Sequence, residues 1–242
     1  NGNDVFGCFA IVYIPRIISL SRTLVKSLKY VMKISADREL NNANVTALIV
    51  TAHPDDECMF FAPTIIRLRE LNVSVHLLCL SEGNYYNQGP ERHRELVSSC
   101  AVLGIPNSRI TIIDDEKLPD DPKAEWSTAL ISSVVAKHLR AHTFNLVLTF
   151  DGSGVSGHAN HVAIYKAIRK YFSFLELPLS WLLPSHFCFL VGSEGYKQAK
   201  AAMLCHGSQL LWFRRLYIVF SRYMFVNTFL VIPRGPKITK IY

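Results

Sequence analysis

The hydrophobic positions of the chain fall into short runs separated by longer stretches of mixed polarity. Residues 47–50 form a continuous apolar run, which is typical of a strand buried on both faces of a parallel sheet. Residues 73–80 and 145–150 show the same pattern, and residues 109–113 form a shorter run. The pattern therefore predicts four strands, the first of which begins near residue 45.

Stretches with mixed polarity lie between the predicted strands and have helical length. We expect helices over residues 59–71, 90–103 and about 124–142, and another that begins near His158. Strand and helix alternate, so the sequence predicts an α/β, Rossmann-like fold with a mostly parallel sheet and helices on both faces. In such a sheet the functional site lies beyond the carboxyl ends of the strands.

Hydrophobic segments flank the predicted domain, which we place at residues 45–232. The leader, residues 1–44, contains an apolar stretch at 5–20 that Pro15 interrupts short of the ~20 residues of a membrane span. We expect the leader to be a candidate membrane-associated segment. The last residues, 233–242, form a tail.

The composition indicates a globular and rather apolar chain, with 50% hydrophobic and 19% charged residues. Its formal net charge is +7, and three arginines lie among aromatic and aliphatic residues in the segment 210–232. This mixture suits a membrane interface better than the groove of a nucleic acid, because aromatic rings and arginine side chains share the headgroup layer. We therefore predict a membrane surface as a partner, no nucleic acid, and a 210–232 segment that lies against the bilayer without crossing it.

The six cysteines show no Cys-x-x-Cys spacing, and several lie inside apolar runs. They are typical of buried free thiols in a reducing compartment. The sequence therefore offers no thiol cluster for a metal.

The first polar cluster follows the first predicted strand directly. It contains His53, Asp55, Asp56 and Glu57, and Pro54 ends the strand before them. Carboxylates at a helix start stabilise the helix by about 0.3 to 1 kcal/mol, which would explain one of the acids. That alternative does not explain a histidine and three acids together at the exit of a buried strand.

The second polar cluster follows the fourth predicted strand. Asp151 ends that strand, and a glycine-rich loop leads to His158 and His161 at the start of a helix. Histidines three residues apart lie on one helical face, so both can turn toward one centre. A single histidine in such a place is more often a surface or capping residue, but two clusters at two strand ends favour a shared site.

Together the clusters supply imidazoles and carboxylates without thiols, which is the donor set of a nitrogen and oxygen site for Zn²⁺. A catalytic zinc takes three protein ligands and a water. A spare carboxylate could accept the proton of the water and a spare histidine could donate one to the leaving group, so the inventory suits amide hydrolysis. The residues alone do not distinguish the role of Asp55 from that of Asp56.

Two motifs in this order resemble the LmbE-like zinc deacetylases: Ala-His-Pro-Asp-Asp-Glu at residues 52–57 and His-x-x-His at residues 158–161. Further segments resemble the branch that acts on N-acetylglucosaminyl-phosphatidylinositol (GlcNAc-PI). These segments are residues 84–89, 102–106, 154–158 and 208–217.

The resemblance implies an activity and a set of residue roles. It implies that His53, Asp56 and His161 hold Zn²⁺, with another divalent metal as the alternative, that Asp55 is the general base, and that His158 is the general acid or stabilises the oxyanion. It also implies hydrolysis of the acetamide of GlcNAc-PI, the second step of glycosylphosphatidylinositol anchor synthesis, at the cytosolic face of the endoplasmic reticulum membrane.

Two further residues have open alternatives. Arg92 matches an Arg-x-x-Glu of the family and is a candidate ligand of the inositol phosphate, whereas the alternative is a solvated helix charge. Asp151 is a candidate for orienting an imidazole from behind, whereas the alternative is an aspartate that caps a loop.

One departure from the resemblance leaves other functions open. A strand that the family usually carries is missing near residues 168–169, as if an internal segment had been lost. The missing strand supports one alternative to a GlcNAc-PI deacetylase, a catalytically impaired variant with a binding or regulatory role. A second alternative, which uses the same zinc site, is a deacetylase of a soluble N-acetylglucosaminyl conjugate.

Overall fold

A computed structural model describes residues 45–121, 123–144, 146–172 and 186–230 of the chain. The predicted leader and tail, residues 1–44 and 233–242, lie outside the described residues. The domain limits that we assign to them stay predictions.

A four-stranded parallel sheet forms the centre of the domain, in the order β3-β2-β1-β4. Its strands are β1 (Thr46–Thr51), β2 (Ser74–Cys79), β3 (Ile110–Ile112) and β4 (Leu146–Leu148). The apolar run at residues 47–50 is fully buried because β1 has a hydrogen-bonded neighbour on each side and helices on both faces. The predicted α/β fold with a mostly parallel sheet is confirmed.

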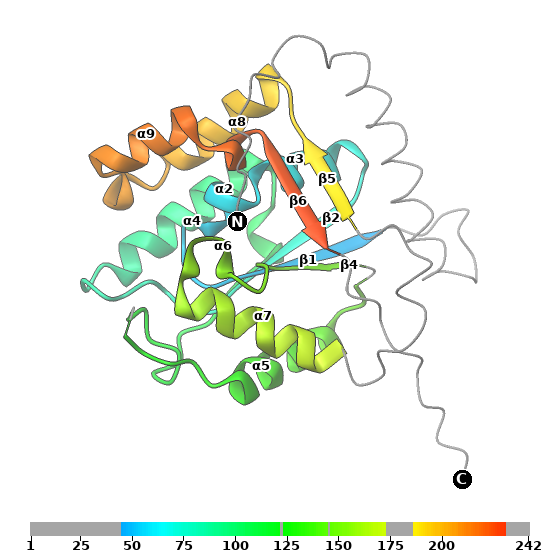
Figure 1. Ribbon diagram of the computed structural model, residues 1–242, viewed down its shortest axis with the longest axis vertical. Coiled ribbons are helices and arrows are strands. Elements are labelled where there is room, and N and C mark those ends of the chain that lie inside the picture. Colours follow the sequence, from blue (N-terminus) through cyan, green and yellow to red (C-terminus); the bar gives the residue numbers. More distant parts are fainter. Residues whose placement is uncertain (1–44, 122, 145, 173–185, 231–242) are drawn as a thin grey trace, which may run out of the picture. The chain divides into compact units, whose positions relative to one another are not determined.

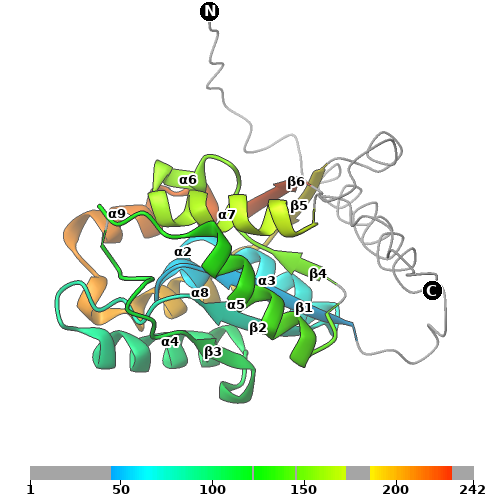
Figure 2. The ribbon, with the colours of Figure 1, turned by 90° about the horizontal axis from the view of Figure 1, so that it is seen from below.

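Helices cover both faces of this sheet, as Figure 1 shows edge-on and Figure 2 shows from the side of α5 and α7. One face carries α5 (Thr128–Ala141) and α7 (Ala159–Phe172). The other face carries α3 (Ala62–Glu70), α4 (Gly89–Leu103) and α8 (Ser193–Leu204). Short turns complete the connections: α6 (Gly154–Gly157) and the 3₁₀ helices η1 (Asn107–Arg109) and η3 (Gly207–Gln209).

Two of the predicted helices have different limits in the structure. The segment 59–71 is not one helix. Phe61 separates α2 (Asp56–Phe60) from α3, which has Pro63 in its first turn. Proline has no backbone N–H, so it suits a first turn and not a helix interior. The helix expected from about residue 124 begins at Thr128, because the side chain of Ser127 accepts a hydrogen bond from the backbone N–H of Leu130 and caps it.

A second, two-stranded sheet packs against α3 and was not predicted. Its antiparallel strands are β5 (His186–Leu190) and β6 (Val226–Leu230). Asn227 in β6 fixes the contact, because its Oδ1 accepts hydrogen bonds from the backbone N–H and the hydroxyl of Thr64, at 3.2 and 2.6 Å.

The segment predicted to lie against the bilayer contains three elements in its described part, residues 210–230. These are α9 (Trp212–Phe220), the 3₁₀ helix η4 (Arg222–Met224) and β6. Contact of the segment with a bilayer stays a prediction. Within the described part of the chain, no helix combines the length and the apolar character that crossing a bilayer requires.

The region of the proposed strand loss is helical. Helix α7 runs without a break across residues 168–169. In the described part of the chain, β4 has a hydrogen-bonded partner on one side only, namely β1. The loss of a strand next to β4 stays a prediction.

Candidate metal and catalytic site

The candidate residues gather at the carboxyl edge of the four-stranded sheet. His53 follows β1, Asp120 follows β3, and His161 begins the helix that follows β4. The sheet order places β1 between β2 and β4. The chain after β1 adds β2 and β3 on one side of β1, and then returns to add β4 on the other side. Ligand sites of open α/β sheets form at such a switch in strand order.

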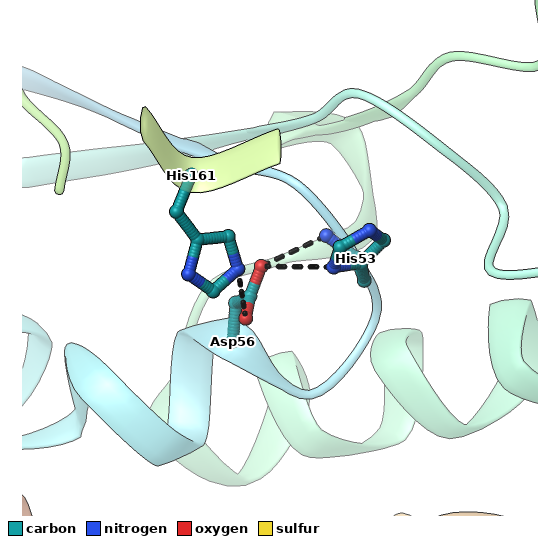
Figure 3. Close-up of side chains that lie close together, drawn as sticks. All are labelled: His53, Asp56 and His161. Atoms are coloured by element: carbon teal, nitrogen blue, oxygen red, sulfur yellow. Dashed lines mark hydrogen bonds and ion pairs between the residues drawn. The ribbon is translucent and has the colours of Figure 1, made fainter. Parts of the chain in front are cut away.

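Three side chains form the metal group, which we define as His53, Asp56 and His161 (Figure 3). One potential ligand atom from each lies within 4.8 Å of the other two, and all three residues are buried. Asp56 is central: its Oδ1 lies 3.2 Å from Nε2 of His161, and its Oδ2 accepts hydrogen bonds from the backbone N–H groups of Ala52 and His53, at 3.0 and 2.8 Å. The carboxylate is therefore fixed by the chain that leaves β1.

The backbone just before Asp56 is strained. Asp55 has a φ of 110°, in the left-handed region that costs a non-glycine residue about 1 to 3 kcal/mol. Glu57 holds this turn, because its Oε2 accepts a 3.0 Å hydrogen bond from the backbone N–H of Asp55. The other oxygen of Glu57 accepts a hydrogen bond from the Ser99 hydroxyl and lies 2.7 Å from Nε2 of His206. Glu57 is thus a structural acid and not a member of the metal group.

The pKa values of Glu57 and His206 change in opposite directions. Burial raises the pKa of Glu57, but His206, the Ser99 hydroxyl and a backbone hydrogen bond together lower it by more, so the net pKa is below the ordinary value. Burial lowers the pKa of His206, but Glu57 together with Asp55 and Glu95 raises it by more. The two residues therefore form a buried ion pair beneath the Asp55 turn.

The ring of His161 is fixed on every side. Its Nδ1 lies 3.1 Å from the carbonyl oxygen of Gly154, which can only accept, so Nδ1 donates and Nε2 faces Asp56. The ring stacks on Phe150 with a centroid distance of 3.8 Å and an interplanar angle of 4°, and Phe60 packs edge-on at 5.7 Å. A hydrogen bond to the far nitrogen is how proteins orient a metal-binding imidazole.

His53 has a carboxylate behind it that the sequence analysis missed. Its Nε2 lies 3.2 Å from Oδ1 of Asp120 and 3.1 Å from the side-chain nitrogen of Asn160, and its Nδ1 lies toward Asp56. Asp120 belongs to the loop after β3, and the carboxyl end of a parallel strand lies at the same edge as those of its neighbours. That rule, applied to the acidic residues after β3, could have identified it.

Asp151 does not orient an imidazole as predicted. It is exposed, and its Oδ1 accepts hydrogen bonds from the backbone N–H groups of Ser153 and Val155 and from the Ser153 hydroxyl, at 3.1, 2.9 and 2.8 Å. Asp151 therefore caps the loop, whose Gly154 carbonyl makes the contact with His161. The predicted contact of Asp151 with an imidazole is wrong, because the Asp151 carboxylate points into the turn that follows it.

Arg92 lies beside the metal group, where its guanidinium holds two loops together. Nη1 donates to the Gly83 carbonyl at 3.0 Å and to Oδ2 of Asp120 at 2.7 Å, and Nη2 donates to the Pro54 carbonyl at 2.8 Å. Gly83 has a φ of +75°, and a Cβ there would lie 2.6 Å from the guanidinium carbon. Arg92 is thus buried against a glycine; its predicted contact with a substrate phosphate stays a prediction.

The two predicted catalytic residues lie next to the metal group. Asp55 is buried, and its Oδ2 forms an ion pair with Nη1 of Arg214. His158 is half-buried, with ring centroids 5.0 Å from His53 and 4.8 Å from His161, and its Nδ1 has no hydrogen-bond partner among the described atoms. Burial lowers the pKa of His158, and the neighbouring imidazoles lower it further.

The metal group suits a divalent ion. It offers two imidazole nitrogens and one carboxylate, the donor set of catalytic zinc sites. Burial lowers the pKa of His53 despite the nearby Asp56 and Asp120, which favours the neutral form that binds metals. Nε2 of His161 is buried and lies 3.2 Å from Oδ1 of Asp56, so both atoms are placed to bind the same ion.

Comparison with known proteins decides the family. The family model described as PIG-L, GlcNAc-PI de-N-acetylase, matches residues 48–172. The N-acetylglucosaminyl-phosphatidylinositol de-N-acetylase of Bos taurus is 47% identical over 205 residues, covering 75% of this chain and 81% of the bovine protein. The chain belongs to the GlcNAc-PI de-N-acetylase family. A probable GlcNAc-PI de-N-acetylase of Schizosaccharomyces pombe is 31% identical over 209 residues, covering 74% and 84%.

Solved structures of other deacetylases share the fold of this GlcNAc-PI de-N-acetylase family member. The N,N'-diacetylchitobiose deacetylase of Pyrococcus horikoshii, complexed with its inhibitor MPG, has a TM-score of 0.59 at 18% identity and covers 88% of this chain and 86% of its own. The zinc-inhibited form of teicoplanin deacetylase Orf2 has a TM-score of 0.54 at 13% identity, covering 69% and 85%. The predicted family, its deacetylase class and the fold are confirmed.

Loss of a metal ligand should abolish stable metal binding. We expect His53→Ala, Asp56→Ala and His161→Ala each to weaken the affinity for Zn²⁺ by more than about 100-fold, because two protein ligands remain from three. Metal content after gel filtration and competition with a chelating dye would measure this. Stoichiometric zinc in all three variants would refute the assignment.

The same measurement of zinc binding can test the role of Asp120 against a matched control. Asp120→Asn should weaken zinc binding by about 10- to 100-fold, because it removes the carboxylate behind His53. Asp121→Asn changes the neighbouring residue in the same way, and its carboxylate accepts a hydrogen bond from the backbone of Lys123 instead. It should bind zinc like the wild type.

Metal affinity should rise with pH through the raised pKa of His161. Burial lowers this pKa, but Asp56, the Gly154 carbonyl and Asp55 together raise it by more, so it lies above the ordinary 6.5; below this pKa the metal-free protein carries a proton on Nε2. A metal must displace that proton, so below this pKa the affinity should fall by up to about tenfold per pH unit. Calorimetric titration with zinc in two buffers of different ionisation enthalpy would report the released proton. An affinity that is independent of pH would contradict the expectation.

Proposed function

We propose that this protein is a zinc enzyme that hydrolyses the acetamide of GlcNAc-PI to glucosaminyl-phosphatidylinositol and acetate, a step of glycosylphosphatidylinositol anchor synthesis. One observation carries the proposal. The metal group is complete, and a spare carboxylate, Asp55, and a spare imidazole, His158, stand beside it in a member of this family.

Each residue then has a definite task. When bound, zinc supplies a Lewis acid for the acetamide carbonyl and lowers the pKa of a water. Asp55 accepts the proton of the attacking water, since its carboxylate lies one residue before Asp56 in the same buried turn. His158 donates a proton to the departing amine or a hydrogen bond to the oxyanion, because it faces the metal group from the turn between α6 and α7 and its ring is half-buried.

The surface of α9 supports a membrane-bound substrate over a soluble conjugate. Its exposed apolar patch, which we define as Trp212, Phe213, Leu216, Val219 and Phe220, lies on one face of the helix. Trp212 and Phe220 are 73% and 79% exposed, which is unusual for such large side chains next to a polar site. An apolar helical face flanked by arginines suits the bilayer interface. We propose that the protein works on the cytosolic face of the endoplasmic reticulum membrane, with this patch in the headgroup layer.

The alternative of an impaired variant rests on the proposed loss of a strand. The geometry of the metal group speaks against a dismantled site, because His161, which comes after β4, lies 3.2 Å from Asp56, which comes after β1. The enzymatic proposal is therefore preferred.

Acetate release tests the proposed activity. Zinc-loaded protein should release acetate from GlcNAc-PI in detergent micelles, and Asp55→Asn should lower kcat by about 100-fold or more while it keeps the metal, because an amide cannot accept the proton. Lys137→Ala, an exposed change on α5, serves as the control and should behave like the wild type. Wild-type protein that holds zinc and releases no acetate would refute the proposal.

Vesicle binding tests the membrane proposal. Trp212→Ser combined with Phe220→Ser should weaken binding to vesicles of phosphatidylcholine and phosphatidylinositol by at least about tenfold, since two large apolar side chains no longer enter the interface. The experiment needs protein without residues 1–44, so that the leader does not contribute, and circular dichroism to show that the double variant is folded. Equal binding by both proteins would rule out α9 as the contact.

A further inference from the structure

Helix α9 has an inner face that reaches the site from the patch. Arg214, Tyr217 and Ile218 project inward from it: the Tyr217 hydroxyl donates to the Met59 carbonyl at 2.7 Å, and Ile218 is buried. The Tyr217 hydrogen bond holds α9 against helix α2, to which Met59 belongs. One helix therefore carries the apolar patch outward and a guanidinium inward.

Arg214 lies at the border between the site and solvent. Its Nη1 pairs with Oδ2 of Asp55 and contacts Sδ of Met59 at 3.1 Å. The Arg214 side chain is 19% exposed, whereas that of Asp55 is 5% exposed. Both of these contacts run through Nη1, and the side chain keeps part of its surface accessible.

Arg92, the other arginine of the site, is placed differently. Its side chain is 7% exposed, and Nη1 and Nη2 are both engaged by the backbone carbonyls of Gly83 and Pro54 and by Asp120. Moving Arg92 would break the contact between two loops and leave Asp120 without its cation. Of the two arginines, Arg214 is the one that can take a new anionic partner.

We propose that Arg214 binds the phosphodiester of the inositol phospholipid substrate and exchanges Asp55 for it. This inference rests on the proposed function and names the residue that recognises the phosphate. A guanidinium matches two phosphate oxygens with parallel N–H donors. In a phospholipid the phosphodiester joins the acyl-bearing glycerol to the headgroup. With the patch in the headgroup layer, Arg214 on the inner side of the same helix lies at the depth of the phosphodiester.

The exchange also explains why the arginine rests on Asp55 in the absence of substrate. Nη2 of Arg92 also lies 3.7 Å from Oδ2 of Asp55, so the Asp55 carboxylate loses its nearer cation and keeps the more distant one when the phosphodiester draws Arg214 away. Substrate binding and the release of the base are thus linked through one side chain. A substrate without the phosphate would lack the anion that draws Arg214 away.

Two water-soluble substrates isolate this contact from membrane binding. The first is N-acetylglucosaminyl-inositol joined to glycerol by a phosphodiester and without acyl chains; the second is N-acetylglucosaminyl-inositol without phosphate. We expect Arg214→Gln to lower the ratio of kcat/KM for the first over the second by about 10- to 100-fold, the worth of a charged hydrogen bond. Arg214→Lys should recover part of the ratio. Arg215→Gln removes the same charge from an exposed position of the same helix and should keep the wild-type ratio.

A binding measurement makes the test independent of turnover. Calorimetry with the phosphodiester compound and Asp55→Asn protein should show a Kd at least about tenfold weaker when Arg214→Gln is added. If both substrates lose activity equally and binding is unchanged, Arg214 only positions Asp55 and the inference is wrong. If the wild type releases no acetate from GlcNAc-PI, the proposed function fails, and the binding experiment still decides whether Arg214 holds the phosphate.

Discussion

Three consecutive acids, Asp55, Asp56 and Glu57, are buried in the turn after β1, and the site depends on how their charges are balanced. An isolated buried carboxylate loses several kcal/mol of hydration, so each of the three needs a partner. Asp55 is paired with Arg214, Asp56 with His161 and Glu57 with His206.

The three partners come from three different parts of the chain. His161 comes from α7, His206 follows α8, and Arg214 comes from α9. The acidic turn therefore draws these elements onto the carboxyl edge of the sheet. Because successive residues at a helix start point in directions about 100° apart, each acid meets a different element and has a different task. Asp56 faces the metal group, Glu57 supports the turn from below, and Asp55 faces the side from which substrate would come.

The pairs also separate stability from chemistry. The Glu57 and His206 pair is sealed in the protein, where both groups are nearly inaccessible, so it can only hold the strained Asp55 backbone. The Asp56 and His161 pair encloses the position for a metal. The Asp55 and Arg214 pair is the more accessible of the three, because the Arg214 side chain is 19% exposed. The pair that we propose to exchange its partner thus lies nearest the protein surface, and the other two pairs lie in the interior.

The sequence by itself determined the parallel sheet and the two polar clusters at strand ends, and the family resemblance of their motifs selected Asp56 over Asp55 for the metal group. These features depend on local patterns: a strand of period two or a continuous apolar run, a proline that ends it, and histidines three residues apart on a helix. Tertiary structure alone decided the partners of those groups. Asp120 stands behind His53, the Gly154 carbonyl takes the place predicted for Asp151, and Arg214 turns inward from a helix that the sequence presented as interfacial. Such pairings join residues that are distant along the chain, and only the packing of α7, α8 and α9 on the sheet brings them within hydrogen-bond distance.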